Sequence, residues 1–274
     1  MLLIFNYVQG YMDFMEYIIL GSDYMINGYQ NEHEFSKYLN GRRVKFLNPL
    51  FKKMIFTLFD NVVDNDIIRT YIDYENRKYD LVIKVNNEIK KISIKKGFKN
   101  SVHVEGIYSF VKFLKDCNLS NEVIDEYLKY HFADGSTDGN GRYRVSAEKY
   151  KEINQWKVDY INEKFNNEKI IRKIVYRFIL QGRNSNDLID GLIYGNVDDF
   201  MFLTSNDIMN MIINKKDIYS TGVHFSSLTC QPMNRCLNYN KVYESKRYCV
   251  QIKWYNLLDE AIEYSNGLLI KKEV

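Results

Sequence analysis

Residues 79–97 constrain the fold of this chain more than any other stretch. Two runs of alternating apolar and polar residues flank the pair Asn86-Asn87, and asparagine tolerates the positive φ that tight hairpin turns require. The pattern predicts a β-hairpin in which these two asparagines form the loop. In that register Asp80 lies opposite Ser93 on the neighbouring strand.

The predicted hairpin brings a carboxylate, a hydroxyl and a lysine together. Side chains alternate across a strand, so Asp80, Ser93 and Lys95 share one face. The opposite face is apolar and consists of Leu81, Ile83, Val85, Ile92 and Ile94. A carboxylate can bind a hard cation and an ammonium group can offset negative charge, so this ribbon suits metal-assisted phosphodiester chemistry.

Length and composition permit a large hydrophobic core. The chain has 274 residues, of which 46% are hydrophobic, enough for one large domain or two of ordinary size. Polar residues interrupt the apolar stretches of the first 20 positions, and no basic segment precedes them. No apolar run reaches the length of a membrane span. We therefore expect a cytoplasmic protein with no membrane partner.

The formal charge is only +3, but basic residues concentrate around the hairpin. They are Arg77, Lys78, Lys84, Lys90, Lys91, Lys95, Lys96 and Lys99. Such a strip could bind a phosphate backbone. The alternative is a solvated strand edge, guarded by lysines against aggregation.

The rest of the pattern mixes helices and strands. Apolar residues at helical spacing cover 31–59, and a strand is predicted at 67–73. A helix is predicted at 107–118 and a further strand at 127–132. Helical segments are prominent after Ser146, which can cap the first of them, and Ser205 is expected to cap a helix over 205–214.

The loop 134–141 reads Asp-Gly-Ser-Thr-Asp-Gly-Asn-Gly. It matches the first half of a calcium-binding EF-hand loop, but the twelfth position is Val145 rather than glutamate. A calcium site and a surface turn are the two interpretations, and the missing ligand favours the turn. In either case this loop is the expected boundary between residues 1–133 and residues 146–274.

The hairpin and its surroundings resemble the PD-(D/E)xK nuclease superfamily, which includes many restriction endonucleases and DNA repair nucleases. The likeness rests on Asp80, on Ser93-Ile94-Lys95, and on the order helix, strand, hairpin, helix across 32–132. It implies an α/β fold of mixed α+β type, with a restriction-endonuclease-like core in 1–133 and a central mixed sheet flanked by helices. Residues 146–274 would form a helical and mixed part that helps to recognise the target, either separate from the core or packed with it.

The same resemblance implies an activity. It points to a Mg²⁺-dependent DNA endonuclease of type II restriction type, which hydrolyses phosphodiester bonds in double-stranded DNA. Asp80 would hold the metal and Lys95 would serve the attacking water. Because cutting both strands of a palindrome favours two-fold symmetry, we also expect a homodimer.

One position departs from the family pattern. The family usually has an acidic residue two positions before the lysine, and this chain has Ser93, which cannot supply a second anionic ligand. Another carboxylate must therefore complete the metal site. The preferred one is Glu105, with His103 beside it to assist, and the second choice is Glu32 on the first helix.

Several residues are candidates for DNA contacts. Lysine suits phosphate, whereas the amides and the guanidinium group suit base edges or phosphate. The candidates are Lys96, Lys99, Asn100, Gln231, Asn234 and Arg235. For the last three, the alternative is a polar loop that satisfies its own backbone.

Other functions remain open at this point. A relative that kept the fold and lost catalysis would bind nucleic acid or a partner, and Ser93 favours that alternative. A metal-free structural protein of a mobile element is the third hypothesis. The sequence contains no GxxxxGK[ST] loop, HExxH or GxSxG motif, so nothing in it supports those enzyme classes.

Overall fold

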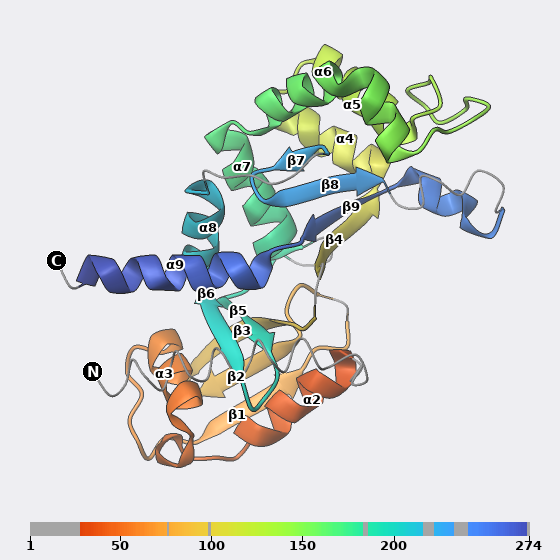
Figure 1. The fold of residues 1–274 in the computed structure, drawn as a ribbon. Helices are drawn as coiled ribbons and strands as arrows, with labels where there is room; N and C mark the ends of the chain where they lie inside the picture. Colours follow the sequence, from red (N-terminus) through yellow and green to blue (C-terminus); the bar gives the residue numbers. More distant parts are fainter. Residues whose placement is uncertain are drawn as a thin grey trace.

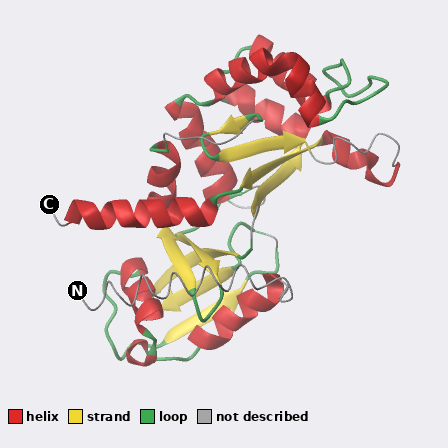
Figure 2. Cartoon of the chain, in the orientation of Figure 1, coloured by secondary structure: helices red, strands yellow, loops and turns green. Residues whose placement is uncertain are grey.

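The computed structural model describes residues 28–75, 77–97, 100–182, 186–215, 222–232 and 241–272. Two β-sheets form the framework, one in the lower half and the other in the upper half of the view in Figure 1. Most of the helices gather around one of these sheets (Figure 2). Within the described ranges no helix is long and apolar enough to cross a membrane.

The first sheet is built around the predicted hairpin. Its strands are β1 (Ile68–Ile72), β2 (Leu81–Val85), β3 (Glu88–Lys95), β5 (Gly191–Gly195) and β6 (Phe200–Thr204). They lie in the order β1-β2-β3-β5-β6. β3 and β5 run parallel, while the other neighbours are antiparallel. The expected central mixed sheet is thereby confirmed.

The hairpin has the predicted register. Val85 pairs with Glu88, and Asn86 adopts the positive φ of 53° that the two-residue turn requires. The five residues of the predicted apolar face are all buried. They pack with α2 (Gly28–Leu39), η1 (Val44–Phe46) and α3 (Pro49–Leu58) in one hydrophobic core.

The second sheet is antiparallel, in the order β4-β9-β8-β7. Its strands are β4 (Asn100–Gly106), β7 (His224–Phe225), β8 (Leu228–Pro232) and β9 (Cys249–Trp254). Alternate residues of β9, namely Val250, Ile252 and Trp254, are buried in a second core. The helical segments that contribute to this core are α4 (Ile107–Asp116), α5 (Asn121–Phe132), α6 (Ala147–Phe165), α7 (Glu168–Ile174), the π-helix η2 (Val175–Gln181), α8 (Ser205–Ile213) and α9 (Leu257–Lys272).

Each sheet takes strands from both sides of the loop 134–141. β5 and β6 follow the loop in sequence and complete the first sheet, whereas β4 precedes it and forms an edge of the second. Gly191 is needed in this arrangement, because a Cβ there would lie 2.5 Å from the ring of Phe202. The boundary expected at the loop therefore does not separate the two sheets.

Two local predictions were wrong. Residues 127–132 are the end of helix α5, not a strand. The helix buries Tyr127, Tyr130 and His131 at three- and four-residue spacing, so its apolar density resembles a strand only over a short window. The cap of α8 is Thr204 rather than Ser205, and it forms a capping box with Asp207.

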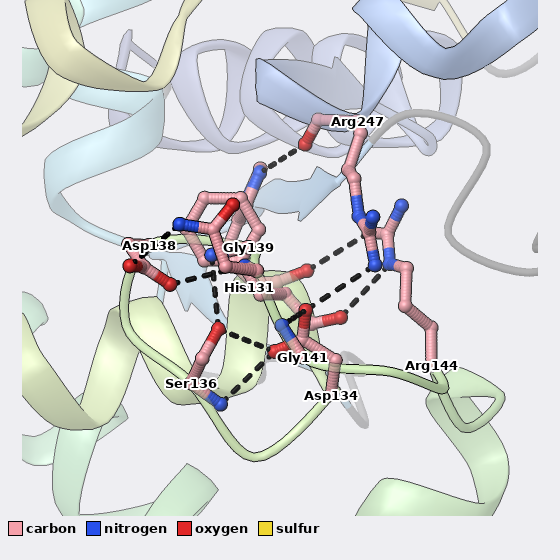
Figure 3. A network of polar contacts seen from close by, with 10 residues as sticks. His131, Asp134, Ser136, Asp138, Gly139, Gly141, Arg144 and Arg247 are labelled. Atoms are coloured by element: carbon pink, nitrogen blue, oxygen red, sulfur yellow. Dashed lines mark hydrogen bonds and ion pairs between the residues drawn. The ribbon is translucent and has the colours of Figure 1, made fainter.

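The loop 134–141 is fixed by internal hydrogen bonds (Figure 3). Oδ1 of Asp134 accepts from the backbone N and Oγ of Ser136, at 3.0 and 2.7 Å. Its Oδ2 accepts from Gly141 N and from Nη2 of Arg247, at 3.1 and 3.2 Å. The guanidinium group of Arg247 thus binds the Asp134 carboxylate, which an EF-hand would use to bind calcium. The surface-turn interpretation fits this network, and Arg247 in η3 (Lys241–Tyr248) ties the turn to the segment that leads into β9.

Candidate active site

Asp80 lies immediately before β2 and continues its ladder, because its backbone N donates to Ile92 O at 2.9 Å. Its Oδ2 accepts from Ser93 Oγ at 3.1 Å, from Ile94 N at 2.6 Å and from Lys95 Nζ at 3.2 Å. The prediction that Asp80, Ser93 and Lys95 share one face is therefore confirmed. Both partners of the ion pair keep about a fifth of their side chain exposed, 21% for Asp80 and 22% for Lys95.

Ser93 orients the carboxylate of Asp80. It is fully buried, and its hydroxyl donates to the oxygen that also accepts from Ile94 N. Lys95 makes a second hydrogen bond, from Nζ to Ile94 O at 2.9 Å. One side of the Asp80 carboxylate is therefore held by three donors.

Glu32 on α2 lies within electrostatic reach of Asp80 and Lys95. The pKa of Glu32 is raised to about 7. Burial makes the largest contribution, the charge of Asp80 adds to it, and the charge of Lys95 opposes both. When Glu32 is ionised, it and Asp80 carry two negative charges, and Lys95 is the cation that acts on Glu32. This region then has an excess of negative charge. α2 begins at Gly28, so Glu32 does not cap the start of the helix.

Contacts to β1 and β5 of the first sheet hold α2 in place. Asn31 is buried and its Nδ2 donates to Gly195 O at 3.0 Å. On the same helix, Ser36 Oγ and Thr70 Oγ1 lie 2.8 Å apart. The helix that carries Glu32 is thereby fixed against β5 and β1.

Glu105 occupies a different environment, in β4 of the second sheet. Its fully buried Oε2 accepts from Arg177 Nη2 at 2.9 Å and from Ser109 Oγ at 3.0 Å. His103 Nε2 lies 3.6 Å from the same oxygen. Burial acts to raise the pKa of Glu105, but the nearby His103 and the charge of Arg177 outweigh it, and the net pKa is lowered.

This cluster changes the preference between the two carboxylates. Burial lowers the pKa of His103 despite the nearby Glu105, so Arg177 is the permanent charge that balances this carboxylate. Glu105 is thus engaged in an internal ion pair between β4 and η2. Of the two candidates, Glu32 is the one whose ionisation responds to Asp80 and Lys95.

The basic strip is largely engaged within the protein. Lys90 and Lys91 form ion pairs with Asp190 and Asp187, at 3.6 and 2.9 Å. The other internal pairs and bonds join Arg77 to Asp73 and Glu75, Lys78 to two backbone carbonyls, and Lys95 to Asp80. Most of the strip therefore serves the fold. The sequence could not indicate this for Lys90 and Lys91, because their acidic partners come from a distant segment.

The residues expected to contact DNA are only partly within the described ranges. Lys96 follows β3 and is partly exposed, Asn100 begins β4, and Gln231 lies in β8. Lys99, Asn234 and Arg235 lie outside the described residues.

A row of polar side chains crosses the outer face of the second sheet. Its members come from separate segments of the sequence, so the sequence alone did not group them. Gln251 Nε2 donates to Ser101 Oγ at 2.9 Å, and Gln231 Nε2 donates to Gln251 Oε1 at 3.4 Å. Tyr255 completes the row by donating to Gln231 at 3.3 Å. Alternation in 249–254 is the sequence signal for this face, because the other residues of β9 are buried.

The comparisons with known proteins bear on the fold. No protein-family model matches the chain, and no curated protein matches it. Among solved structures, the restriction endonuclease MspI in complex with its cognate DNA is similar, with a TM-score of 0.51. The similarity covers 80% of this chain and 87% of that one, at 15% sequence identity.

The chain has a restriction-endonuclease-like fold. The mixed sheet flanked by helices agrees with the expectation from the sequence.

The residues around Asp80 meet the chemical requirements of a divalent cation in part. Asp80 and Glu32 offer carboxylate oxygens, which Mg²⁺ prefers, and the charge of Asp80 adds to the effect of burial in raising the pKa of Glu32. Within the described part of the chain, no group of three or more His, Cys, Asp or Glu side chains could hold a metal ion. A cation here would therefore have two carboxylate ligands and would complete its shell with water and substrate oxygens, as Mg²⁺ commonly does.

Proposed function

We propose that this protein is a Mg²⁺-dependent endonuclease of type II restriction type that hydrolyses phosphodiester bonds in double-stranded DNA. The observation that carries the proposal is the placement of Glu32 beside the Asp80–Lys95 pair, on a fold similar to that of a restriction endonuclease. Glu32 supplies the acidic group that the hairpin lacks at Ser93. The site is then a variant of the PD-(D/E)xK arrangement.

Each residue has a separate role in this proposal. Asp80 and Glu32 hold Mg²⁺, and the chemistry supplied by the bound ion is polarisation of the phosphate and activation of water. Lys95, fixed by Asp80 and by Ile94 O, orients the attacking water and offsets the charge that develops on the phosphate. Ser93 holds the Asp80 carboxylate in position.

The outer face of the second sheet is proposed to contact the target. Gln231 and Gln251 carry amides that can form paired hydrogen bonds with base edges. Lys253 lies on the same strand as Gln251 and is partly exposed, which suits a phosphate or base contact. MspI was solved with its cognate DNA, and DNA is the partner proposed for this chain.

The test is cleavage of several plasmid DNAs by the purified protein with Mg²⁺. Wild type should give discrete fragments, and D80A, K95A and E32Q should not. The matched control is E34Q, which changes an acid of the same helix whose partner is Gln30. Discrete cleavage by wild type that survives in both D80A and E32Q would refute the site.

An inactive relative that binds nucleic acid is the second candidate. It is favoured by Ser93 and by the direct neutralisation of Asp80 by Lys95. Salt-sensitive DNA binding by wild type, with no cleavage of any plasmid in Mg²⁺ or Mn²⁺, would support this alternative over the nuclease.

The homodimer expected from two-fold symmetry stays a prediction. Analytical ultracentrifugation of the protein, alone and with a short duplex that contains its cleavage site, measures the stoichiometry directly. Two protein chains per duplex are expected, and one chain per duplex would contradict the dimer.

A further inference from the structure

Lys78 joins the two sheets beside the candidate active site. It lies two residues before Asp80, and its Nζ donates to Val102 O and to Phe178 O, both at 2.6 Å. The first acceptor is in β4, at the edge of the second sheet, and the other is in η2. The side chain of Lys78, in the segment leading into β2, therefore binds both a strand of the second sheet and the helix η2.

The side chain of Lys78 is packed as well as hydrogen-bonded. A Cβ on Gly182 would lie 3.0 Å from the Cβ of Lys78, and Gly182 has a φ of +76°. The chain that leaves η2 therefore runs directly over the stem of the lysine. A buried amino group is costly unless it is hydrogen-bonded, and the two short bonds to carbonyl oxygens provide that compensation.

The two elements that Lys78 holds are also joined to each other. Arg177 in η2 donates to the buried Glu105 in β4 at 2.9 Å. A buried carboxylate therefore joins β4 to η2, and Lys78 connects both elements to the segment that leads into the hairpin. A π-helix is uncommon and is often found at functional positions, which fits a role for η2 at this junction.

We propose that Lys78 is a positioning residue that fixes the second sheet relative to Asp80 and Lys95. The effect on cleavage rests on the proposed function: DNA held on the outer face of the second sheet meets the hairpin in one orientation because Lys78 removes the freedom between them. Lys78 does not contact DNA in this proposal, since its amino group is engaged by the two carbonyls. Misplacement by about 1 Å is enough to lower a rate about 100-fold.

The first test measures position without activity. Spin labels on Y71C in the first sheet and W156C on α6 occupy exposed sites, 59% and 67% exposed in the wild-type residues. Pulsed electron paramagnetic resonance then gives the distribution of distances between the two labels. Labelling of the native cysteines is measured on the protein without the two introduced cysteines. The distribution should be broader in K78M than in wild type and unchanged in K84M, which alters a partly exposed lysine of β2. An unchanged distribution in K78M would overturn the proposal.

The second test measures the consequence for cleavage. At saturating protein, K78M should cut a bound duplex about 100-fold more slowly than wild type, while its Kd for DNA changes less than threefold. A loss confined to Kd would mean that Lys78 contacts DNA, and the proposal would be wrong. Failure of wild type to cut any DNA would refute the proposed function but leave the distance measurement valid.

A folding defect in K78M is covered by a second variant. The glutamine side chain of K78Q keeps a polar end but is too short to reach both carbonyls. Circular dichroism of K78Q is the check that the variant folds. In K78Q the distance distribution should again broaden, and a wild-type width would overturn the proposal.

Discussion

Lys95 Nζ lies 3.2 Å from Oδ2 of Asp80, the same oxygen that accepts from Ser93 Oγ and Ile94 N. The three donors fix this oxygen, and none of them binds Oδ1. The lysine is therefore an internal counter-ion of the carboxylate as well as the candidate partner of the attacking water.

The first prediction concerns this pair. K95M should lower the single-turnover cleavage rate by at least about 100-fold, because a positioned proton-transfer or charge-stabilising group contributes about that much. Its affinity for Mg²⁺ should not fall, since the substitution removes a cation that competes for Asp80. Isothermal titration with Mg²⁺ checks the affinity, and a weaker Mg²⁺ affinity in K95M than in wild type would contradict the assigned roles.

The second prediction concerns Glu32 and pH. The pKa of Glu32 is raised from 4.5 to about 7 in the folded protein, so the folded state binds the proton more tightly than the unfolded state. Without metal, its contribution to stability should therefore decline as pH rises from about 4.5 to 7 and stay lower above that. E32Q removes the charge and should exceed wild type by about 1 kcal/mol in free energy of unfolding at pH 8, after allowance for solvent screening.

Urea unfolding of wild type, E32Q and the control E34Q at pH 5 and pH 8 measures this difference. Addition of Mg²⁺ should stabilise wild type and leave E32Q nearly unchanged, because a ligand that binds only the folded state adds to its stability. Equal responses of wild type and E32Q to Mg²⁺ would remove Glu32 from the metal site.

The third prediction concerns Glu105, whose role is structural. E105Q should lower the free energy of unfolding by about 3 kcal/mol at pH 7, since it leaves Arg177 without its buried partner. The folded-state pKa of Glu105 is lowered, so this contribution is complete above the unfolded pKa of about 4.5 and is lost as pH falls through the folded value. The control E152Q breaks a surface pair with Lys149 and should change stability by less than about 0.5 kcal/mol.

The fourth prediction concerns the outer face of the second sheet. Q251A should reduce the preference for the cleavage site by about 1–3 kcal/mol and leave non-specific binding nearly unchanged. K96A should weaken specific and non-specific binding alike and reduce the salt dependence by about one phosphate contact. Fluorescence anisotropy with specific and scrambled duplexes at several salt concentrations separates the two effects. Equal losses on both duplexes for Q251A would exclude base recognition by this residue.

The fifth prediction concerns the loop 134–141. Calcium at millimolar concentration should not change the Tm, because Asp134 is engaged by Ser136, Gly141 and Arg247. D134A should destabilise the protein by about 3 kcal/mol, since it leaves a partly buried guanidinium group unpaired. A calcium-dependent rise in Tm that is lost in D134A would restore the EF-hand interpretation.

The sequence by itself determined the hairpin, its two-residue turn and the face shared by Asp80, Ser93 and Lys95. These features depend on local periodicity and on the conformational tolerance of asparagine, and both are readable from neighbouring residues. The mixed sheet and the helices before and after it could also be predicted, because apolar spacing indicates which faces are buried.

Only the tertiary structure decided which acid faces the hairpin. Glu32 and Glu105 are both acidic residues near plausible elements, and their sequence distances from Asp80 do not distinguish them. The pairing of β4 with β9, in which Ser101 lies opposite Lys253, places Glu105 in the second sheet, while the packing of α2 on the first sheet brings Glu32 within electrostatic reach of Asp80. Long-range strand pairing is set by the burial of whole faces, which no local pattern encodes.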